Sequence, residues 1–266
     1  MKAIKLFVNH NEKAQAIAKM VKEKLQKEKF EIVDKDYDIA IAIGGDGSFL
    51  RMVKNTNFNE SCLYIGINAG TLGFAQEVKI NKIDQFIKDL KENNYKIENI
   101  GIQEIEIKTP DSLSKYLSLN EIVIRDIELN TVNLKVLIED IVLEDFVGDG
   151  LLIATSFGST AYNLSFGGSI VYNTFHTLQL TPIAPLNNES YRNLLNSVIV
   201  PDNKKIIIKP MNRTKDLLIT IDGDNNIYKD VETVTTTITN RTIQLLRMKN
   251  YNFIEKINNK FLKGEQ

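Results

Sequence analysis

The chain has 266 residues, and 33 lysines and arginines against 34 aspartates and glutamates leave a net charge of −1. This balance excludes the broad positive field that drives nonspecific binding to nucleic acids or membranes, and no apolar run approaches the roughly 20 residues that span a bilayer. One cysteine, Cys62, cannot form an internal disulfide, and two distant histidines give no zinc-ligand spacing. The composition therefore predicts a cytoplasmic globular protein with no nucleic-acid or membrane partner.

The first hundred residues alternate strand and helix. Apolar runs predict strands over 1–9, 38–43 and 63–67, and helical spacing of apolar residues predicts helices over 12–29, 48–54 and 83–90. This alternation predicts an open parallel sheet with helices on its faces, in which ligands bind beyond the carboxyl ends of the strands. Two glycine-rich turns, 44–47 and 68–74, are expected at that edge.

From residue 100 onward the chain is rich in short β-forming runs bounded by Asn, Asp and Gly. These runs are 102–107, 116–124, 131–139, 141–147, 151–154, 206–209, 217–221, 231–239 and 242–247. The stretch 252–262 has helical spacing and is expected to pack back on the first domain. The predicted fold class is α/β plus β, with an α/β domain over 1–99 joined by the C-terminal helix 250–266, and a β-rich domain over 100–249.

The turn Gly44-Gly45-Asp46-Gly47 lies between a predicted buried strand and a predicted helix. Unpaired backbone N–H groups and the helix dipole make such a turn a cradle for phosphate. A carboxylate repels phosphate, so Asp46 fits a role in handling a proton or a metal ion, and the combination indicates phosphoryl transfer. The alternative is a tight turn in which Asp46 merely caps the helix.

Three further segments carry polar or glycine-rich patterns. Asn120-Glu121 interrupts an apolar strand, where Asn suits a base edge and Glu suits vicinal ribose hydroxyls; the alternative is a strand-edge pair facing water. The run 148–168 combines glycines, hydroxyl residues and a predicted short helix, 159–165, that can line a nucleotide or simply be a capped helix. In 68–74, Leu72 and Phe74 can contact a base or sugar, or pack into the core.

Together with 66–74 and Pro182-Ile183-Ala184-Pro185, these segments resemble bacterial NAD kinases, a family related to lipid kinases and phosphofructokinases. The resemblance implies an N-terminal α/β domain and a C-terminal nucleotide-binding β-sandwich. It implies transfer of phosphate from ATP, another NTP or polyphosphate to the 2′-hydroxyl of the adenosine ribose of NAD, giving NADP. It further implies Mg²⁺ or another divalent cation held mainly by substrate phosphates, with no protein ligand assigned, and a homo-oligomer, commonly a tetramer.

The resemblance also implies roles for individual residues, with Asp46 as the catalytic base. The implied nucleotide-binding residues are Asp46, Gly47, Asn120, Glu121, Asp149, Thr160, Ala161, Tyr162, Asn163, Leu164, Ser165 and Ala184. Gly44, Gly45, Leu72, Phe74 and Asp222 are expected to line the phosphate or nucleotide site. Val147 departs from the family pattern, because many relatives carry a basic residue there, so this contact is missing or is supplied elsewhere.

Two other functions stay open at this point. A lipid or sphingoid-base kinase shares the Gly-Gly-Asp-Gly turn, although it does not account for 158–168. A sensor that binds NAD or NADP without turnover is the second alternative. No residue selects among phosphoryl donors or decides whether NADH is accepted, and feedback by NADP(H) and the oligomeric state rest on the resemblance alone.

Overall fold

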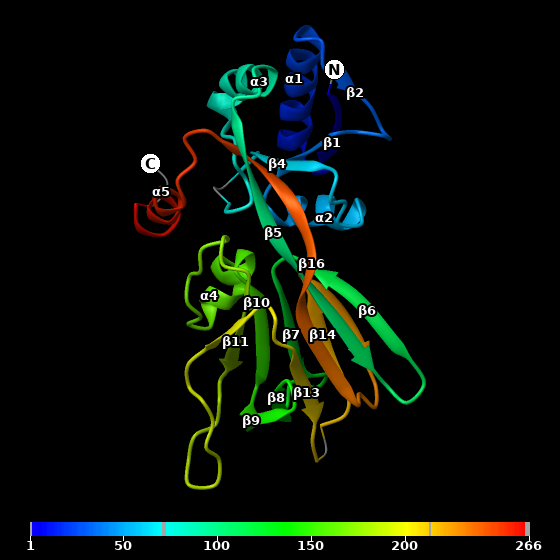
Figure 1. The fold of residues 1–266 in the computed structure, drawn as a ribbon, viewed down its shortest axis with the longest axis vertical. Coiled ribbons are helices and arrows are strands. Elements are labelled where there is room, and N and C mark those ends of the chain that lie inside the picture. Colours follow the sequence, from blue (N-terminus) through cyan, green and yellow to red (C-terminus); the bar gives the residue numbers. More distant parts are fainter. Residues whose placement is uncertain (1, 71–72, 213, 264–266) are drawn as a thin grey trace. The chain divides into compact units, whose positions relative to one another are not determined.

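A computed structural model describes residues 2–70, 73–212 and 214–263, and the chain forms two compact units (Figure 1). The first unit holds residues 1–100 and 242–266, and the second holds residues 101–241. Two long strands, β5 (Tyr95–Lys108) and β16 (Thr233–Met248), each contribute residues to both units.

The first unit is built on a parallel sheet with the strand order β2-β1-β3-β4-β16. Its other strands are β1 (Ala3–Val8), β2 (Glu31–Ile32), β3 (Ile39–Gly44) and β4 (Leu63–Asn68). In the register of the sheet, Ile41 of β3 pairs with Leu6 of β1 and with Ile65 of β4. All six residues of β3 are buried, as expected for a central parallel strand covered on both faces.

The first unit also contains helices. They are α1 (Glu12–Lys27), α2 (Asp46–Asn55), α3 (Ile83–Lys91) and α5 (Phe253–Ile257), with a 3-10 turn η1 (Ile80–Lys82) and a π-helical turn η3 (Asn258–Leu262). The side chain of Asn11 caps α1 by accepting the N–H of Ala14. Val21 of α1 and Phe86 of α3 share one apolar cluster with Ile41 of β3, so these two helices pack together over the sheet. As predicted, the C-terminal helix belongs to the first unit.

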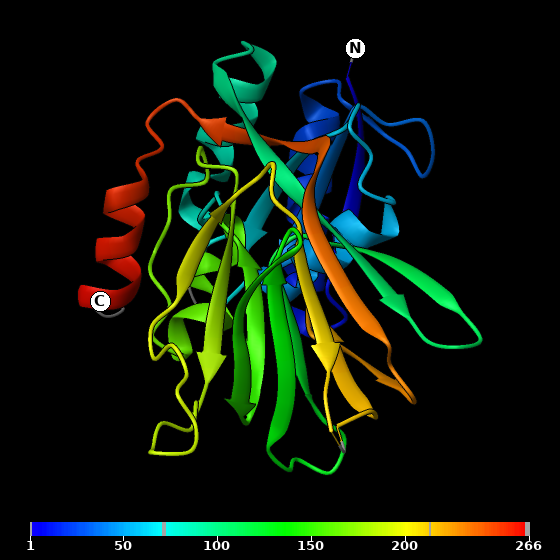
Figure 2. The ribbon, with the colours of Figure 1, turned by 60° about the horizontal axis from the view of Figure 1, so that its bottom comes forward.

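The second unit consists of two sheets, whose strands run side by side in Figure 2. One sheet has the antiparallel order β12-β11-β10-β7-β14-β15; in the other, β16, β13, β8 and β9 are neighbours, and β5 pairs with β16 and β6. The strands are β6 (Leu113–Ser118), β7 (Glu121–Asp126), β8 (Val132–Ile138), β9 (Ile141–Gly148), β10 (Gly150–Thr155), β11 (Thr177–Ile183), β12 (Val198–Pro201), β13 (Ile206–Pro210), β14 (Leu217–Ile221) and β15 (Asp224–Tyr228). A 3-10 turn η2 (Phe157–Thr160) and a short helix α4 (Tyr162–Ser165) follow β10.

A single apolar cluster joins the two sheets of the second unit. Ile122 and Ile124 of β7 share it with Ile206 and Ile208 of β13, so side chains of both sheets fill one core. The second unit is therefore a β-sandwich, and the predicted fold class is confirmed. Among the described residues, no helix has both the length and the apolar character needed to cross a membrane.

Several elements differ from the sequence prediction. The run 116–124 is two strands, β6 and β7, because the backbone turns at Leu119 and Asn120 to direct successive N–H groups at the carboxylate of Asp222. The runs 231–239 and 242–247 form one strand, β16, because Asn240 and Arg241 continue the extended backbone instead of turning. The predicted helix 159–165 is shorter than expected and is split into η2 and α4.

Candidate functional site

The glycine loop 44–47 joins β3 to α2, at the edge where parallel strands end. In the described part of the chain no side chain caps the N-terminus of α2, and Gly45 and Gly47 are exposed. A Cβ at Gly44 would lie 2.3 Å from the Ser48 Oγ, whereas a Cβ built at Gly45 would have no atom of the described residues within 4 Å apart from Gly45 itself and its two chain neighbours. Gly44 is therefore needed for close packing, and the exposed backbone beyond it suits an approaching anion.

The Asp46 carboxylate is held by the backbone of the second glycine-rich segment. Its Oδ2 accepts the N–H of Phe74 at 3.0 Å, and its Oδ1 accepts the N–H of Ala75 at 2.9 Å. A Cβ at Gly73 would lie 2.0 Å from the same Oδ1, so only glycine fits there. Each carboxylate oxygen accepts one of these hydrogen bonds and keeps further lone pairs, so the group is fixed in orientation and still able to accept a proton.

Two predicted lining residues lie in or near this segment. The ring of Phe74 packs against Phe253 at 6.4 Å and Phe261 at 5.2 Å between centroids, so it anchors the C-terminal helix. Leu72 lies outside the described residues.

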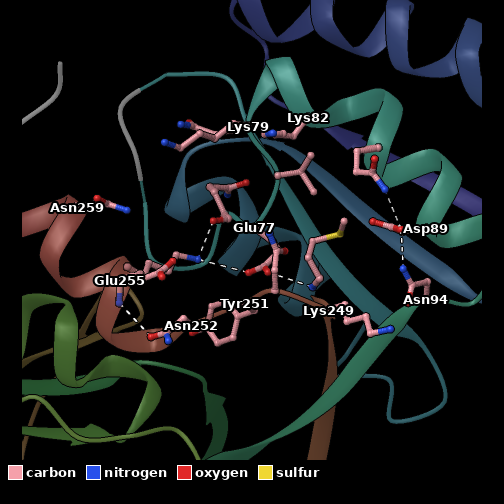
Figure 3. Close-up of a pocket in the computed structure, with 17 residues that line it drawn as sticks. Glu77, Lys79, Lys82, Asp89, Asn94, Lys249, Tyr251, Asn252, Glu255 and Asn259 are labelled. Carbon is pink, nitrogen blue, oxygen red and sulfur yellow. Dashed lines mark hydrogen bonds and ion pairs between the residues drawn. The ribbon is translucent and has the colours of Figure 1, made fainter.

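A pocket of about 660 Å³ lies in the first unit, between α3, the segment 76–79 and the chain from 248 to 259 (Figure 3). Glu77 lines it and accepts hydrogen bonds from Arg247 at 3.0 Å and from the N–H of Met248 at 3.1 Å, while the Lys256 Nζ lies 3.6 Å from the same carboxylate. Within the described part of the chain, no three His, Cys, Asp or Glu side chains gather as a metal site.

In the second unit, Asp222 organises the predicted Asn120-Glu121 pair. Its carboxylate accepts the Ser118 hydroxyl at 2.7 Å and the N–H groups of Leu119, Asn120 and Glu121 at 2.7, 2.8 and 3.2 Å. Burial raises the pKa of Asp222, while these four hydrogen bonds oppose the rise. The carboxylate thus fixes the backbone from which the Glu121 side chain projects.

Glu121 is a buried acid with an unused oxygen. The residue is 7% exposed, and its Oε2 has no hydrogen-bond partner among the residues that the structure describes. Burial and then the nearby charge of Asp222 raise the pKa of Glu121 to about 8, although the Tyr162 N–H opposes the rise. Glu121 therefore carries a proton at neutral pH and offers both a donor and an acceptor to a ligand hydroxyl.

The loop after β10 packs tightly on this pair. The Thr155 hydroxyl donates to the Leu119 carbonyl at 2.5 Å and accepts the N–H of Gly158 at 3.0 Å. A Cβ at Gly158 would lie 2.1 Å from the Asn120 carbonyl oxygen, so this close approach requires glycine. The backbone of the Asn120-Glu121 pair is therefore fixed by this loop as well as by Asp222.

The predicted nucleotide-binding residues of this loop differ in accessibility. Asn163 is fully buried and uses its amide inside the protein, accepting from the Thr181 hydroxyl of β11 at 2.6 Å and donating to the Ser159 carbonyl of the loop at 3.3 Å. Its neighbours leave more surface open: Thr160, Ala161 and Leu164 are half-buried, and Tyr162 and Ser165 are exposed. Within this loop, the neighbours of Asn163 are therefore the residues that are open to contact with a ligand.

Glu121 and Arg125 lie on one face of the sheet that contains β7. Glu121, Val123 and Arg125 alternate along β7 and share this face, because side chains two apart point the same way. The Arg125 guanidinium donates to the Tyr162 hydroxyl at 3.1 Å and lies 5.8 Å from that ring. At one end of the same sheet, exposed Asp149 and Ala184 lie close together, since the Asp149 N–H donates to the carbonyl of Ile183.

The structure thus groups the predicted residues in two sets, one around Asp46 and one around Glu121, each within its own unit. Sequence reasoning missed Arg125, Gln76 and Lys256. Arg125 lies four residues after Glu121 on one predicted strand, and this even spacing was a signal that the two side chains share a face of the sheet. Gln76 and Lys256 carried no such signal, because a polar residue after a glycine turn and a lysine on a helix normally face water. Val147, where the resemblance implies a basic residue, is 6% exposed.

Comparison with known proteins gives consistent matches. The family model of the ATP-NAD kinase N-terminal domain matches residues 4–95, and that of the ATP-NAD kinase C-terminal domain matches residues 119–246. The NAD kinase of Finegoldia magna is 38% identical over 98% of both chains, and NAD kinase 2 of Bacillus subtilis is 30% identical over 95% of this chain and 93% of its own.

Two solved structures share the fold at 20% identity. Yeast NADH kinase complexed with NADH has a TM-score of 0.82 and covers 100% of this chain and 89% of its own. An NAD kinase from Archaeoglobus fulgidus in complex with ATP has a TM-score of 0.74 and covers 96% of this chain and 98% of its own.

Proposed function

The chain belongs to the NAD kinase family, and we propose that Asp46 is the general base of its reaction. The enzyme phosphorylates NAD to NADP using ATP. As the 2′-oxygen of the adenosine ribose bonds to the γ-phosphorus, the bond from that phosphorus to the β,γ-bridging oxygen breaks and ADP leaves. Asp46 accepts the proton of the attacking hydroxyl. The observation that carries this role is the oriented Asp46 carboxylate inside an exposed glycine loop.

The glycine loop binds phosphate in this proposal. The exposed backbone of Gly45 and Gly47 and the uncapped N-terminus of α2 favour an anion. Since such transfers pass through a loose transition state, positioning and charge neutralisation supply most of the acceleration. Mg²⁺ would enter with the nucleotide as MgATP, because the described residues provide no cluster of acidic ligands for a resident ion.

The second unit binds the adenosine part of NAD in this proposal. Glu121 contacts a ribose hydroxyl through its unused oxygen, and Asn120 contacts the adenine edge. Asp149, Ala184 and the residues around Tyr162 line the nucleotide. Arg125 supplies the positive charge that is absent at Val147.

We also propose a cytoplasmic homo-oligomer, commonly a tetramer in this family. The free thiol of Cys62 is typical of a reducing compartment. Strand β9 ends the strand order of its sheet and exposes three successive apolar side chains, Ile141, Val142 and Leu143. An apolar edge strand of this kind is a natural subunit contact.

The test is NADP formation by the purified protein with NAD, ATP and Mg²⁺, followed with an NADP-specific dehydrogenase. Steady NADP formation that stops on chelation of the metal supports the proposal, and polyphosphate in place of ATP tests the donor. Saturable binding of NAD without NADP formation with any donor would identify a sensor instead.

A further inference from the structure

The C-terminal helix contacts the segment that holds Asp46. The Lys256 Nζ, on α5, donates to the main-chain carbonyl of Gln76 at 2.8 Å. The side chain of Gln76 in turn donates from Nε2 to the Gly45 carbonyl, also at 2.8 Å. A continuous path of hydrogen bonds therefore runs from α5 to the glycine loop, through the residue that directly follows Ala75.

These groups are buried, so the contacts are shielded from water. The Lys256 side chain is 9% exposed, and the Gln76 residue is 1% exposed. Lys256 shares the carboxylate of Glu77 with Arg247, and Arg247 also pairs with Glu98 at 2.6 Å. The Phe74 ring, packed on Phe253 and Phe261, fixes the same segment from its apolar side.

The charge of Lys256 is held at a cost to folding. Burial and then the charge of Arg247 lower the pKa of Lys256 to about 8, although Glu77 and Asp46 oppose the fall. A buried lysine with a lowered pKa destabilises the folded state relative to an exposed one. Such a residue is a candidate for function because stability alone does not account for it.

We propose that Lys256 is a positioning residue for phosphoryl transfer, which fixes the segment 74–77 and through it the Asp46 carboxylate and the Gly45 carbonyl. This inference rests on the proposed role of Asp46. It makes the C-terminal helix part of the catalytic apparatus, with Lys256 acting through the segment that holds Asp46.

The test replaces Lys256 by methionine, which keeps the length of the side chain and removes the ammonium. Lys256→Met is expected to lower kcat about tenfold or more while the KM values for NAD and ATP stay within about threefold. Hydrogen exchange at the amides of Phe74 and Ala75 is expected to quicken, with exchange in α1 unchanged. Lys263→Met, an exposed lysine further along the chain, is the matched control and is expected to keep wild-type kinetics.

Gln76→Leu breaks the next link and gives an independent reading if Lys256→Met folds poorly. The two substitutions together are expected to lower kcat no further than either alone, and Lys256→Met is expected to change nothing in an Asp46→Asn background. A folded Lys256→Met, or in its place a folded Gln76→Leu, that keeps more than half of the wild-type kcat would overturn the inference while leaving the NAD kinase assignment intact. A wild-type protein that forms no NADP would overturn both.

Discussion

Replacing Glu121 by glutamine is expected to stabilise the folded protein and to raise the KM for NAD. Glu121 ionises at its ordinary value of 4.5 when the chain is unfolded and near 8 when folded. The folded chain therefore holds this proton more tightly, so the contribution of Glu121 to stability falls as pH rises from 4.5 to 8. Between pH 4.5 and pH 7, at about 1.4 kcal/mol per pH unit, the loss reaches about 3 kcal/mol in the free energy of unfolding.

Glutamine carries no titrating proton and can still accept the Tyr162 N–H, so Glu121→Gln should recover much of that loss. Denaturant unfolding of wild type and variant at pH 7 and at pH 5 measures it: we expect a gain of about 3 kcal/mol at pH 7 and less than about 1 kcal/mol at pH 5. The KM for NAD should rise several-fold. Glu189→Gln, at an exposed glutamate, is the control. Equal gains at both pH values would refute the assignment of a buried, protonated carboxyl.

Two glycine substitutions test the close approaches around the two sets of residues. Gly73→Ala places a Cβ 2.0 Å from the Asp46 Oδ1 and should displace the carboxylate. We expect kcat to fall about a hundredfold with little change in melting temperature. Unchanged turnover would show that the orientation of Asp46 is unimportant. Gly158→Ala places a Cβ 2.1 Å from the Asn120 carbonyl oxygen, which is backbone and cannot swing away. It should lower stability by about 2 kcal/mol and weaken NAD binding by calorimetry, and a variant as stable as wild type would contradict this packing.

The fold was predictable because its signals are local. The apolar run before Gly44 identifies a buried strand, and the lysines and glutamates between apolar positions of α1 identify a helix that covers it. The break between β6 and β7 was not predictable, because its cause is the carboxylate of Asp222, about a hundred residues further along the chain.

The candidate site was predictable only for residues whose side-chain type is unusual for their sequence surroundings. Asp46 and Glu121 stand out as carboxylates within glycine or apolar surroundings. The groups that orient Asp46 are backbone N–H groups of Phe74 and Ala75, and every residue except proline offers such a group. Lys256 resembles any other solvated helix lysine until the fold buries it.

The most direct test of the central claim compares turnover and NAD binding in Asp46→Asn. Asparagine keeps the shape of the side chain and cannot accept the hydroxyl proton as a carboxylate does, so kcat should fall by about 10²- to 10⁴-fold while the NAD dissociation constant stays within a few-fold. Asp36→Asn, at an exposed aspartate of the same unit, controls for the loss of one charge. An Asp46→Asn enzyme that retained a substantial fraction of the wild-type kcat would contradict the role of Asp46 as the general base.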